Sequence, residues 1–292
     1  MKILYPCHEI EGLKKVDNSF LDEFRVAKIQ GHDCYLFDHD KFLDGSIITN
    51  LPNSPEEKSI LLRGWMLSVE KYTELYSSLK KDYGYTLINT PEQYKNCHHF
   101  PESYDYTKDY TSRAIFIKDW DVEVLEKISK FFGDKNFLMK DFVKSAKEKP
   151  ELFKMPSGIT GEQLLKKVED FIEYRGSLFN EGLVFKEFID LKRDDSGNLN
   201  EWRIFYYENK RVSASPNSNQ NEDSEFPRNF LEEVVDNIAF QIDSNFFTID
   251  VSLKEDGDWM IIETGDGQVS GLSPNQNSLE FYASIEEKIK IK

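Results

Sequence analysis

The sequence predicts an α/β fold for the first part of the chain and an α+β fold for the second. Apolar runs of strand length alternate with amphipathic runs of helical length from the N-terminus onwards. The last part ends in strand-like runs joined by short turns, which is typical of antiparallel pairs. The chain has 292 residues, and this length favours two domains over one small module.

Composition limits the classes of partner and the compartment. The chain carries 37 Lys and Arg against 53 Asp and Glu, a net charge of −16, so its surface repels polyanions and general nucleic-acid binding is not expected. The three cysteines have no C-x-x-C spacing, which favours reduced thiols. No run approaches about 18 apolar residues, and the N-terminus has no signal-peptide core. We therefore expect a cytoplasmic protein without a membrane partner.

Two strand–helix–strand units are expected in the first part of the chain. Their elements are, in order, residues 2–7, 19–31, 33–38, 59–64, 69–84 and 85–89. Ligands usually meet such sheets at the carboxyl ends of the strands. Arg63 ends one of these strands, where a guanidinium suits a carboxylate or a phosphate; a surface salt bridge is the alternative.

The boundary between the two parts is expected within residues 97–110, which are rich in turn formers and aromatic residues. This stretch opens with Cys97, His98 and His99. Adjacent side chains point in different directions, and no partner cluster has zinc-like spacing, so a structural or incidental role is expected for these three.

The second part continues with strands and helices and ends in antiparallel pairs. Strands are expected over 113–117, 137–143, 182–192 and 201–215, helices over 121–133, 158–176 and 229–242, and a hairpin over 246–275.

The hairpin carries acidic residues where a packed sheet prefers apolar ones. Asp250 alternates with Ile249 along one strand, and Glu263 lies on the other. If residues 254–258 form the turn, the two carboxylates lie near each other on one face. Facing carboxylates repel unless a proton or a cation separates them, and magnesium prefers oxygen ligands. The alternative is that these acids are solvated or cap turns.

In the second part the chain resembles the ATP-grasp superfamily. In that family an Asp, a Glu about thirteen positions later and an Asn or similar residue just beyond it bind the magnesium ions of ATP. Asp250 and Glu263 stand thirteen apart, and residues 261–272 resemble the closing motif. Gly265 replaces the Asn, so the resemblance leaves Asp266 as the expected third ligand.

Three further segments match in the expected order. Residues 137–141 resemble the strand whose lysine, here Lys140, reaches the α-phosphate, and residues 184–189 resemble the hinge that meets the adenine edge. Residues 201–212 resemble the next strand pair, whose Glu or Arg faces the ribose or the phosphates. The resemblance implies nucleotide-binding roles for Lys140, Lys186, Glu187, Phe188, Ile189 and Glu201.

The resemblance also implies a domain layout. A Rossmann-like pre-ATP-grasp α/β domain is expected over residues 1–112 and an ATP-grasp domain over 113–292, with a lid of about 118–185 and a core of about 186–292. The chain looks like a divergent bacterial or phage member. Where many members have a glycine-rich loop over the phosphates, this chain has Lys144 and Lys147.

The expected function is an ATP- and magnesium-dependent carboxylate–amine ligase that forms an acylphosphate, with manganese as a possible substitute metal. Arg203 would stabilise the transferring phosphoryl group and Arg63 would grip the acceptor, a small-molecule or peptide carboxylate. Three alternatives stay open: a nucleotide-binding interaction module without ligase chemistry, a phosphotransferase, and a purely structural acidic protein. The acceptor, the amine donor and the oligomeric state do not follow from the sequence.

Overall fold

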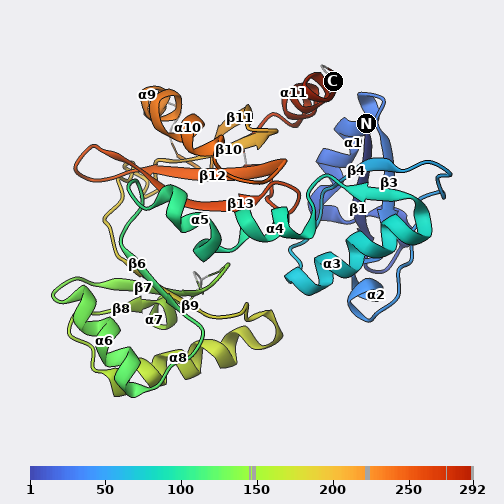
Figure 1. The fold of residues 1–292 in the computed structure, drawn as a ribbon. Coiled ribbons are helices and arrows are strands. Elements are labelled where there is room, and N and C mark those ends of the chain that lie inside the picture. The colour runs from blue at the N-terminus through green and yellow to red at the C-terminus, as the bar shows by residue number, and fades with distance from the viewer. Residues whose placement is uncertain (145, 147–148, 221–223, 274, 291–292) are drawn as a thin grey trace.

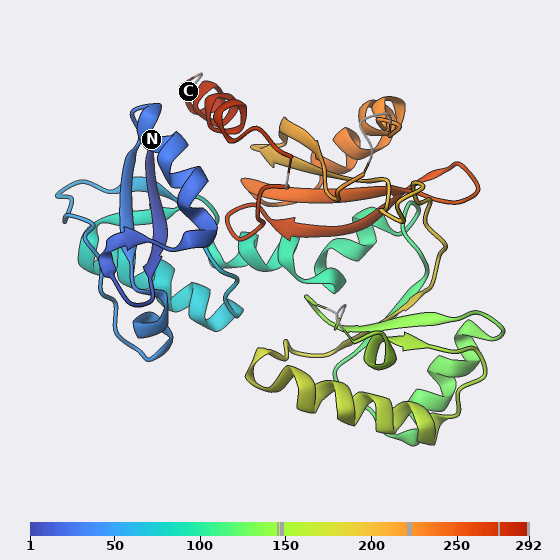
Figure 2. The same cartoon turned by 180° about the vertical axis from the view of Figure 1, so that it is seen from behind.

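Three β-sheets organise the chain. The computed structural model describes every residue except 145, 147–148, 221–223, 274 and 291–292 (Figure 1). In both views the first sheet forms one body with its helices, and the second and third sheets lie one below the other beside it (Figures 1 and 2).

The first sheet is parallel apart from one short strand. Its strands are β1 (Lys2–His8), β2 (Gly12–Val16), β3 (Asp33–Phe37), β4 (Lys58–Leu62) and β5 (Tyr85–Leu87). The parallel order is β3-β1-β4-β5, and β2 pairs antiparallel with the end of β1. The helices are α1 (Leu21–Ile29), α2 (His39–Leu43) and α3 (Val69–Ser78), which continues as a π-helical turn over Leu79–Tyr83. Alternate residues of β1 pack on opposite faces, because Tyr5 joins a cluster with Phe20 whereas Leu4 joins one with Tyr72.

Two helices replace the irregular boundary expected over residues 97–110. These are α4 (Pro91–His98) and α5 (Phe100–Thr107). Thr90 caps α4 by accepting from the Gln93 amide, while the Gln93 side chain accepts from the Thr90 amide. His99 between the helices has an extended backbone, and Pro101 lies in the first turn of α5. The turn formers thus mark helix starts and not a loop.

The second sheet is antiparallel in the order β6-β9-β7-β8. Its strands are β6 (Ala114–Ile117), β7 (Phe137–Asp141), β8 (Lys154–Met155) and β9 (Leu183–Glu187), and its helices are α6 (Val122–Phe132), α7 (Pro150–Phe153) and α8 (Gly161–Arg175). Phe137 and Phe185 pack with the residues of α6 and α8. Because Leu138 pairs with Lys186, and Lys140 with Val184, both lysines lie on the opposite face of this sheet.

The third sheet is antiparallel in the order β11-β10-β12-β13. Its strands are β10 (Glu201–Tyr207), β11 (Lys210–Pro216), β12 (Phe246–Leu253) and β13 (Trp259–Asp266), with α9 (Arg228–Phe230), a π-helical turn (Leu231–Val235) and α10 (Asp236–Ala239) beside them. Ile204 and Ile249 pack against Leu231 and Ile238. Every residue of β12 is buried, and this includes Asp250.

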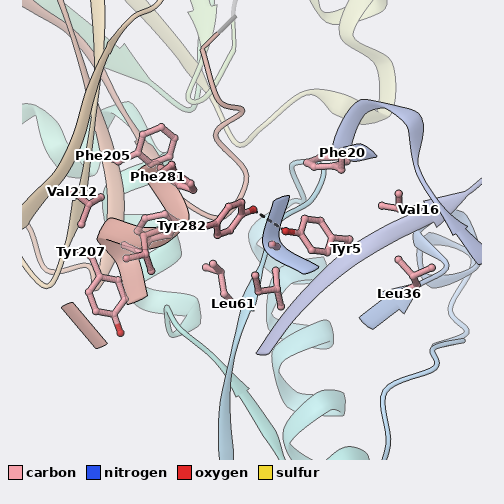
Figure 3. Packing of buried hydrophobic residues seen from close by; sticks show 14 of the residues in the cluster. Tyr5, Val16, Phe20, Leu36, Leu61, Phe205, Tyr207, Val212, Phe281 and Tyr282 are labelled. Atoms are coloured by element: carbon pink, nitrogen blue, oxygen red, sulfur yellow. Dashed lines mark hydrogen bonds between the residues drawn. The ribbon is translucent and has the colours of Figure 1, made fainter. Parts of the chain in front are cut away.

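The C-terminal helix α11 (Ser278–Lys290), which sequence reasoning did not predict, joins the first and third sheets. Phe281 and Tyr282 share one buried cluster with Tyr5 of β1 and Phe205 of β10 (Figure 3). The hydroxyl groups of Tyr5 and Tyr282 lie 2.7 Å apart in a hydrogen bond. In the described part of the chain, no helix is both long and apolar enough to cross a membrane.

Candidate functional site

Asp250 and Glu263 lie directly opposite each other on β12 and β13. Residues 254–258 connect the strands, as the sequence pattern predicts. Opposed residues of an antiparallel pair place their Cβ atoms about 5 Å apart on one face. The hairpin therefore brings the two acids together, although Asp250 is only 3% exposed.

Each carboxylate is neutralised by a cation from another element. Arg203 of β10 binds Asp250 through two hydrogen bonds, from Nε at 2.9 Å and from Nη2 at 2.6 Å. Lys140 of β7 reaches across from the second sheet, and its Nζ lies 3.1 Å from Oε2 of Glu263. The fork-shaped guanidinium suits a carboxylate, and it suits a phosphate equally well.

Lys186 adds a second positive charge beside Lys140. Its Nζ donates to the carbonyl of Ile262 at 2.7 Å, and both ammonium groups lie over the ring of Phe100, at 5.0 Å for Lys186 and 5.6 Å for Lys140. Burial, together with the charge of Lys140, lowers the pKa of Lys186 to about 7. Two amines thus converge on the single carboxylate of Glu263, which favours the arrival of a further anion.

A pocket of about 80 Å³ opens beside Asp250, Glu263 and Arg203. We call it the carboxylate pocket. Its charged and polar lining consists of His98, Lys144, Arg203, Thr248, Asp250, Glu263, Thr264 and Ser270. Met66, which follows β4, is also part of the lining, so the carboxyl end of the first sheet meets the acids of the third.

Asp266 does not belong to this pocket, contrary to the sequence-based expectation. It pairs with Phe247, so it lies on the opposite face of the hairpin from Asp250. It is fully buried and accepts hydrogen bonds from the side chain of Asn89 and the amide of Gln268. Burial raises its pKa to about 7. The strand period explains the error, because Glu263 shares a face with Gly265 and not with the next residue.

Gly265 occupies the place where the resemblance expects an amide side chain. A Cβ atom there would lie 3.0 Å from Oγ1 of Thr248 and 3.1 Å from Oγ of Ser270. The two hydroxyl groups contact each other at 3.1 Å and fill the space instead. The sequence contains no pattern that points to this hydroxyl pair.

The residues present fit a magnesium ion that arrives with phosphate. Among the described residues there is no group of three or more His, Cys, Asp or Glu side chains arranged to hold a metal. Magnesium keeps several waters and is usually bound through one or two carboxylates plus the phosphates of a substrate. Asp250 and Glu263 supply that pair of carboxylates, with the hydroxyl groups of Thr248 and Ser270 nearby.

The structure contradicts the predicted role of Arg63 in binding the acceptor. Its side chain is 0% exposed and donates to both carboxylate oxygens of Glu23, at 2.9 and 3.1 Å, and to the carbonyl of Gly267. The Tyr282 hydroxyl also donates to Glu23, at 2.7 Å. Arg63 therefore ties α1, α11 and the loop after β13 together, and it has no exposed surface with which to bind an acceptor.

The predicted hinge residues are not gathered in the carboxylate pocket. Glu187 pairs with Arg113 at 2.6 Å. Phe188 lines a separate pocket of about 280 Å³, and Ile189 lines another of about 490 Å³ together with Trp259.

Glu201 lies closer to the acids. Its carboxylate accepts from Nδ2 of Asn217 at 2.6 Å, and the same Nδ2 lies 3.3 Å from Oδ2 of Asp250. Asn217 directly follows β11. The sequence around Asn217 contains no recognisable motif, because it is the fold that brings this residue close to Asp250.

Comparisons with known proteins identify the family and the fold. The model of the family described as "ATP-grasp domain, R2K clade family 3" matches residues 131–285, more than half of the chain. No curated protein matches. The fold is similar to the crystal structure of the D-cycloserine synthetase DcsG, at 11% identity over 98% of this chain and 99% of that one, with a TM-score of 0.64.

Two further solved structures share the fold at a similarly low sequence identity. The D-alanyl-alanine synthetase A of Vibrio cholerae is 12% identical over 98% of this chain and 93% of that one, with a TM-score of 0.61. The macrocyclase MdnC of Microcystis aeruginosa, bound with its precursor peptide MdnA, is 12% identical over 98% and 99% of the two chains, with a TM-score of 0.59. This chain therefore has the ATP-grasp fold and belongs to the ATP-grasp domain family, R2K clade family 3.

Proposed function

We propose that the chain is an ATP- and magnesium-dependent ligase that joins a carboxylate to an amine through an acylphosphate. One observation carries the proposal: the opposed carboxylates of Asp250 and Glu263 are each paired with a cation from a different element, Arg203 and Lys140. In this site each carboxylate is paired with a cation, and Lys186 lies beside Lys140 as a further amine. The site becomes complementary to magnesium and a polyphosphate once the pairs exchange partners.

Each charged side chain of the site would have a role in this exchange. Asp250 and Glu263 would hold the magnesium ion, which neutralises the phosphoryl oxygens when it is bound. Arg203 and Lys140, released from the carboxylates, would bind phosphate oxygens, and Lys186 would add a third cation from the same face as Lys140. Asp250 is buried, and the side chains of Arg203, Lys140 and Glu263 are only 18%, 12% and 23% exposed, so these charges act where water screens them poorly.

In the proposed reaction a carboxylate oxygen of the acceptor attacks the γ-phosphorus of ATP. The bond from that phosphorus to the β-γ bridging oxygen breaks, and ADP leaves. An amine then attacks the acyl carbon and releases inorganic phosphate, and the amine proton passes to solvent. Positioning and charge neutralisation supply the catalysis in this scheme, with no covalent protein nucleophile.

The proposal includes a domain layout. The first sheet would be the Rossmann-like pre-ATP-grasp domain, the second sheet with α6 to α8 the lid, and the third sheet the core. Ala114 and Lys186 pair within the second sheet, so we place the lid at about 113–187, slightly wider than the sequence predicts. The neighbouring structures, which are named as synthetases and a macrocyclase, support a ligase.

A second candidate is a nucleotide-binding module without ligase chemistry. Gly265 stands where the resemblance expects a further metal ligand, and Asp266 is turned to the opposite face. Loss of that ligand would weaken metal positioning more than nucleotide binding. This candidate predicts that the chain binds ATP with magnesium and releases no ADP with any acceptor.

Mass spectrometry of a cell extract incubated with ATP, magnesium and the protein separates the candidates. With the wild-type chain we expect ADP and a product whose formation requires ATP. With Glu263→Gln we expect neither. A product that persists unchanged in Glu263→Gln would contradict the metal assignment. Magnesium-dependent ATP binding without any product would favour the second candidate.

A further inference from the structure

His98, the last residue of α4, lies in the wall of the carboxylate pocket. Its side chain is 8% exposed, and its Nε2 has no hydrogen-bond partner among the residues that the structure describes. The ring packs on Tyr94, with centroids 4.9 Å apart. Buried polar atoms in native proteins nearly always have a partner, so an unpartnered one beside a pocket points to a ligand.

The charged groups around His98 indicate the chemical class of that ligand. Lys144, Lys140 and Glu263 all act on the imidazole. Burial and the nearby lysines hold the pKa of His98 well below its usual range. A neutral imidazole carries one N–H donor and one acceptor. A ligand that reaches the imidazole in this pocket passes Lys144, so an anion that accepts hydrogen bonds fits best.

The position of His98 within the site indicates which part of a bound nucleotide it would contact. The predicted hinge residues Phe188 and Ile189 lie in other pockets, Lys140 and Lys186 come from the second sheet, and His98 shares its pocket with Asp250 and Glu263. A nucleotide that extends from the hinge past the lysines reaches the carboxylates with its terminal phosphate. His98 is therefore at the terminal phosphate and away from the base.

On the basis of the proposed function, we propose that His98 is a further binding residue of the site, whose imidazole N–H donates to an oxygen of the terminal phosphoryl group. It would make the site discriminate a nucleoside triphosphate from a diphosphate. His99 offers a control, because it is also buried but does not line the carboxylate pocket; it lies edge-on to Phe142, with Nδ1 3.6 Å from Glu181.

The test compares two nucleotides by titration calorimetry with magnesium present: the non-hydrolysable triphosphate analogue AMPPNP, and ADP. The variants are His98→Phe, which keeps a ring on Tyr94, His98→Gln, which keeps a neutral N–H, and His99→Phe. We expect His98→Phe to weaken AMPPNP binding about tenfold or more and ADP binding less than about twofold, since a hydrogen bond to a charged group is lost only with the triphosphate. His98→Gln should recover part of the loss, and His99→Phe should change neither affinity.

Each other outcome overturns the inference. If His98→Phe binds both nucleotides like the wild type, or loses affinity equally for both, His98 does not contact the terminal phosphate. Thermal unfolding of each variant shows whether an equal loss comes from misfolding, and His98→Gln then repeats the comparison in a folded chain. If the wild-type chain binds neither nucleotide, the proposed function fails and this inference fails with it.

Discussion

Lys140 and Glu263 form an ion pair across two sheets, although 123 positions separate them in the chain. Their side chains are 12% and 23% exposed, so the pair is shielded from water on most sides. It links the second sheet to the hairpin that carries Asp250. In the proposed function this contact exists in the absence of nucleotide and gives way when phosphate and metal arrive.

A double-mutant cycle on this pair should show coupling. Lys140→Met removes the ion pair between Lys140 and Glu263, and Glu263→Gln leaves Lys140 beside the amine of Lys186. We expect each single change to lower the free energy of unfolding, and the double change to cost about 0.5–3 kcal/mol less than the sum. Urea denaturation of the four proteins measures this. Strict additivity would show that the contact is not formed in solution.

Arg203 should be far more sensitive than a surface arginine. Its two hydrogen bonds neutralise Asp250, which is buried, so Arg203→Met leaves an unpaired buried carboxylate. We expect a loss of about 3–5 kcal/mol in the free energy of unfolding. Arg203→Met combined with Asp250→Asn should recover much of this loss. Arg228→Met, at an exposed arginine of α9, is the control; an equal effect there would refute the argument.

Replacing Lys186 should raise the stability of the free chain and lower its affinity for nucleotide. Its pKa is lowered to about 7 from 10.5, so between these values the unfolded chain holds a proton that the native chain lacks. Stability from this group therefore rises with pH in that window. Lys186→Met removes the buried amine and should stabilise the free chain by a few kcal/mol at about pH 6 and by much less at about pH 10.

The same substitution should weaken magnesium–AMPPNP binding, because a phosphate favours the charged amine. For the wild type, affinity should fall as the pH rises above about 7, since binding then requires proton uptake. The variant should lack this pH dependence. Denaturation and calorimetry at several pH values measure both effects, and a variant that is less stable than the wild type at low pH would contradict this account.

Asp266 should affect stability without affecting the metal. Its pKa is raised to about 7 from 3.8, so the native chain holds a proton that the unfolded chain loses between these values. Stability from this group is therefore fully present below about pH 4 and is lost as the pH rises to about 7. We expect the stability of Asp266→Asn relative to the wild type to improve with rising pH over this window. Magnesium–AMPPNP affinity should stay within about twofold; a large loss would return Asp266 to the metal site.

Local patterns predict the parts of the fold and site that depend on neighbours in the sequence. The strand alternation and the short turn place Asp250 opposite Glu263 because both follow from the two-residue period. The same two-residue period places Asp266, three positions after Glu263, on the other face of the strand. The expectation for Asp266 rests on the family motif, which carries no information about the face of the strand.

Contacts between distant segments could not be predicted. Arg63 ends a strand where ligands usually bind, but only the fold shows that Glu23 of α1 neutralises it. His98 looks incidental in a turn-rich stretch, and it enters the pocket because α4 ends there. Residues 97–107, apart from His99, lie in α4 and α5, because capping at Thr90 starts α4 and both helices pack on β13 despite the turn-rich composition.

The most direct test of the central claim is the affinity of the chain for magnesium–AMPPNP when each carboxylate is neutralised in turn. Asp250→Asn and Glu263→Gln are compared with Asp258→Asn, an exposed acid in the turn of the same hairpin. We predict that the first two lose at least about a hundredfold in affinity and that the third binds like the wild type. Full affinity in both Asp250→Asn and Glu263→Gln would show that this pair of carboxylates does not hold the metal.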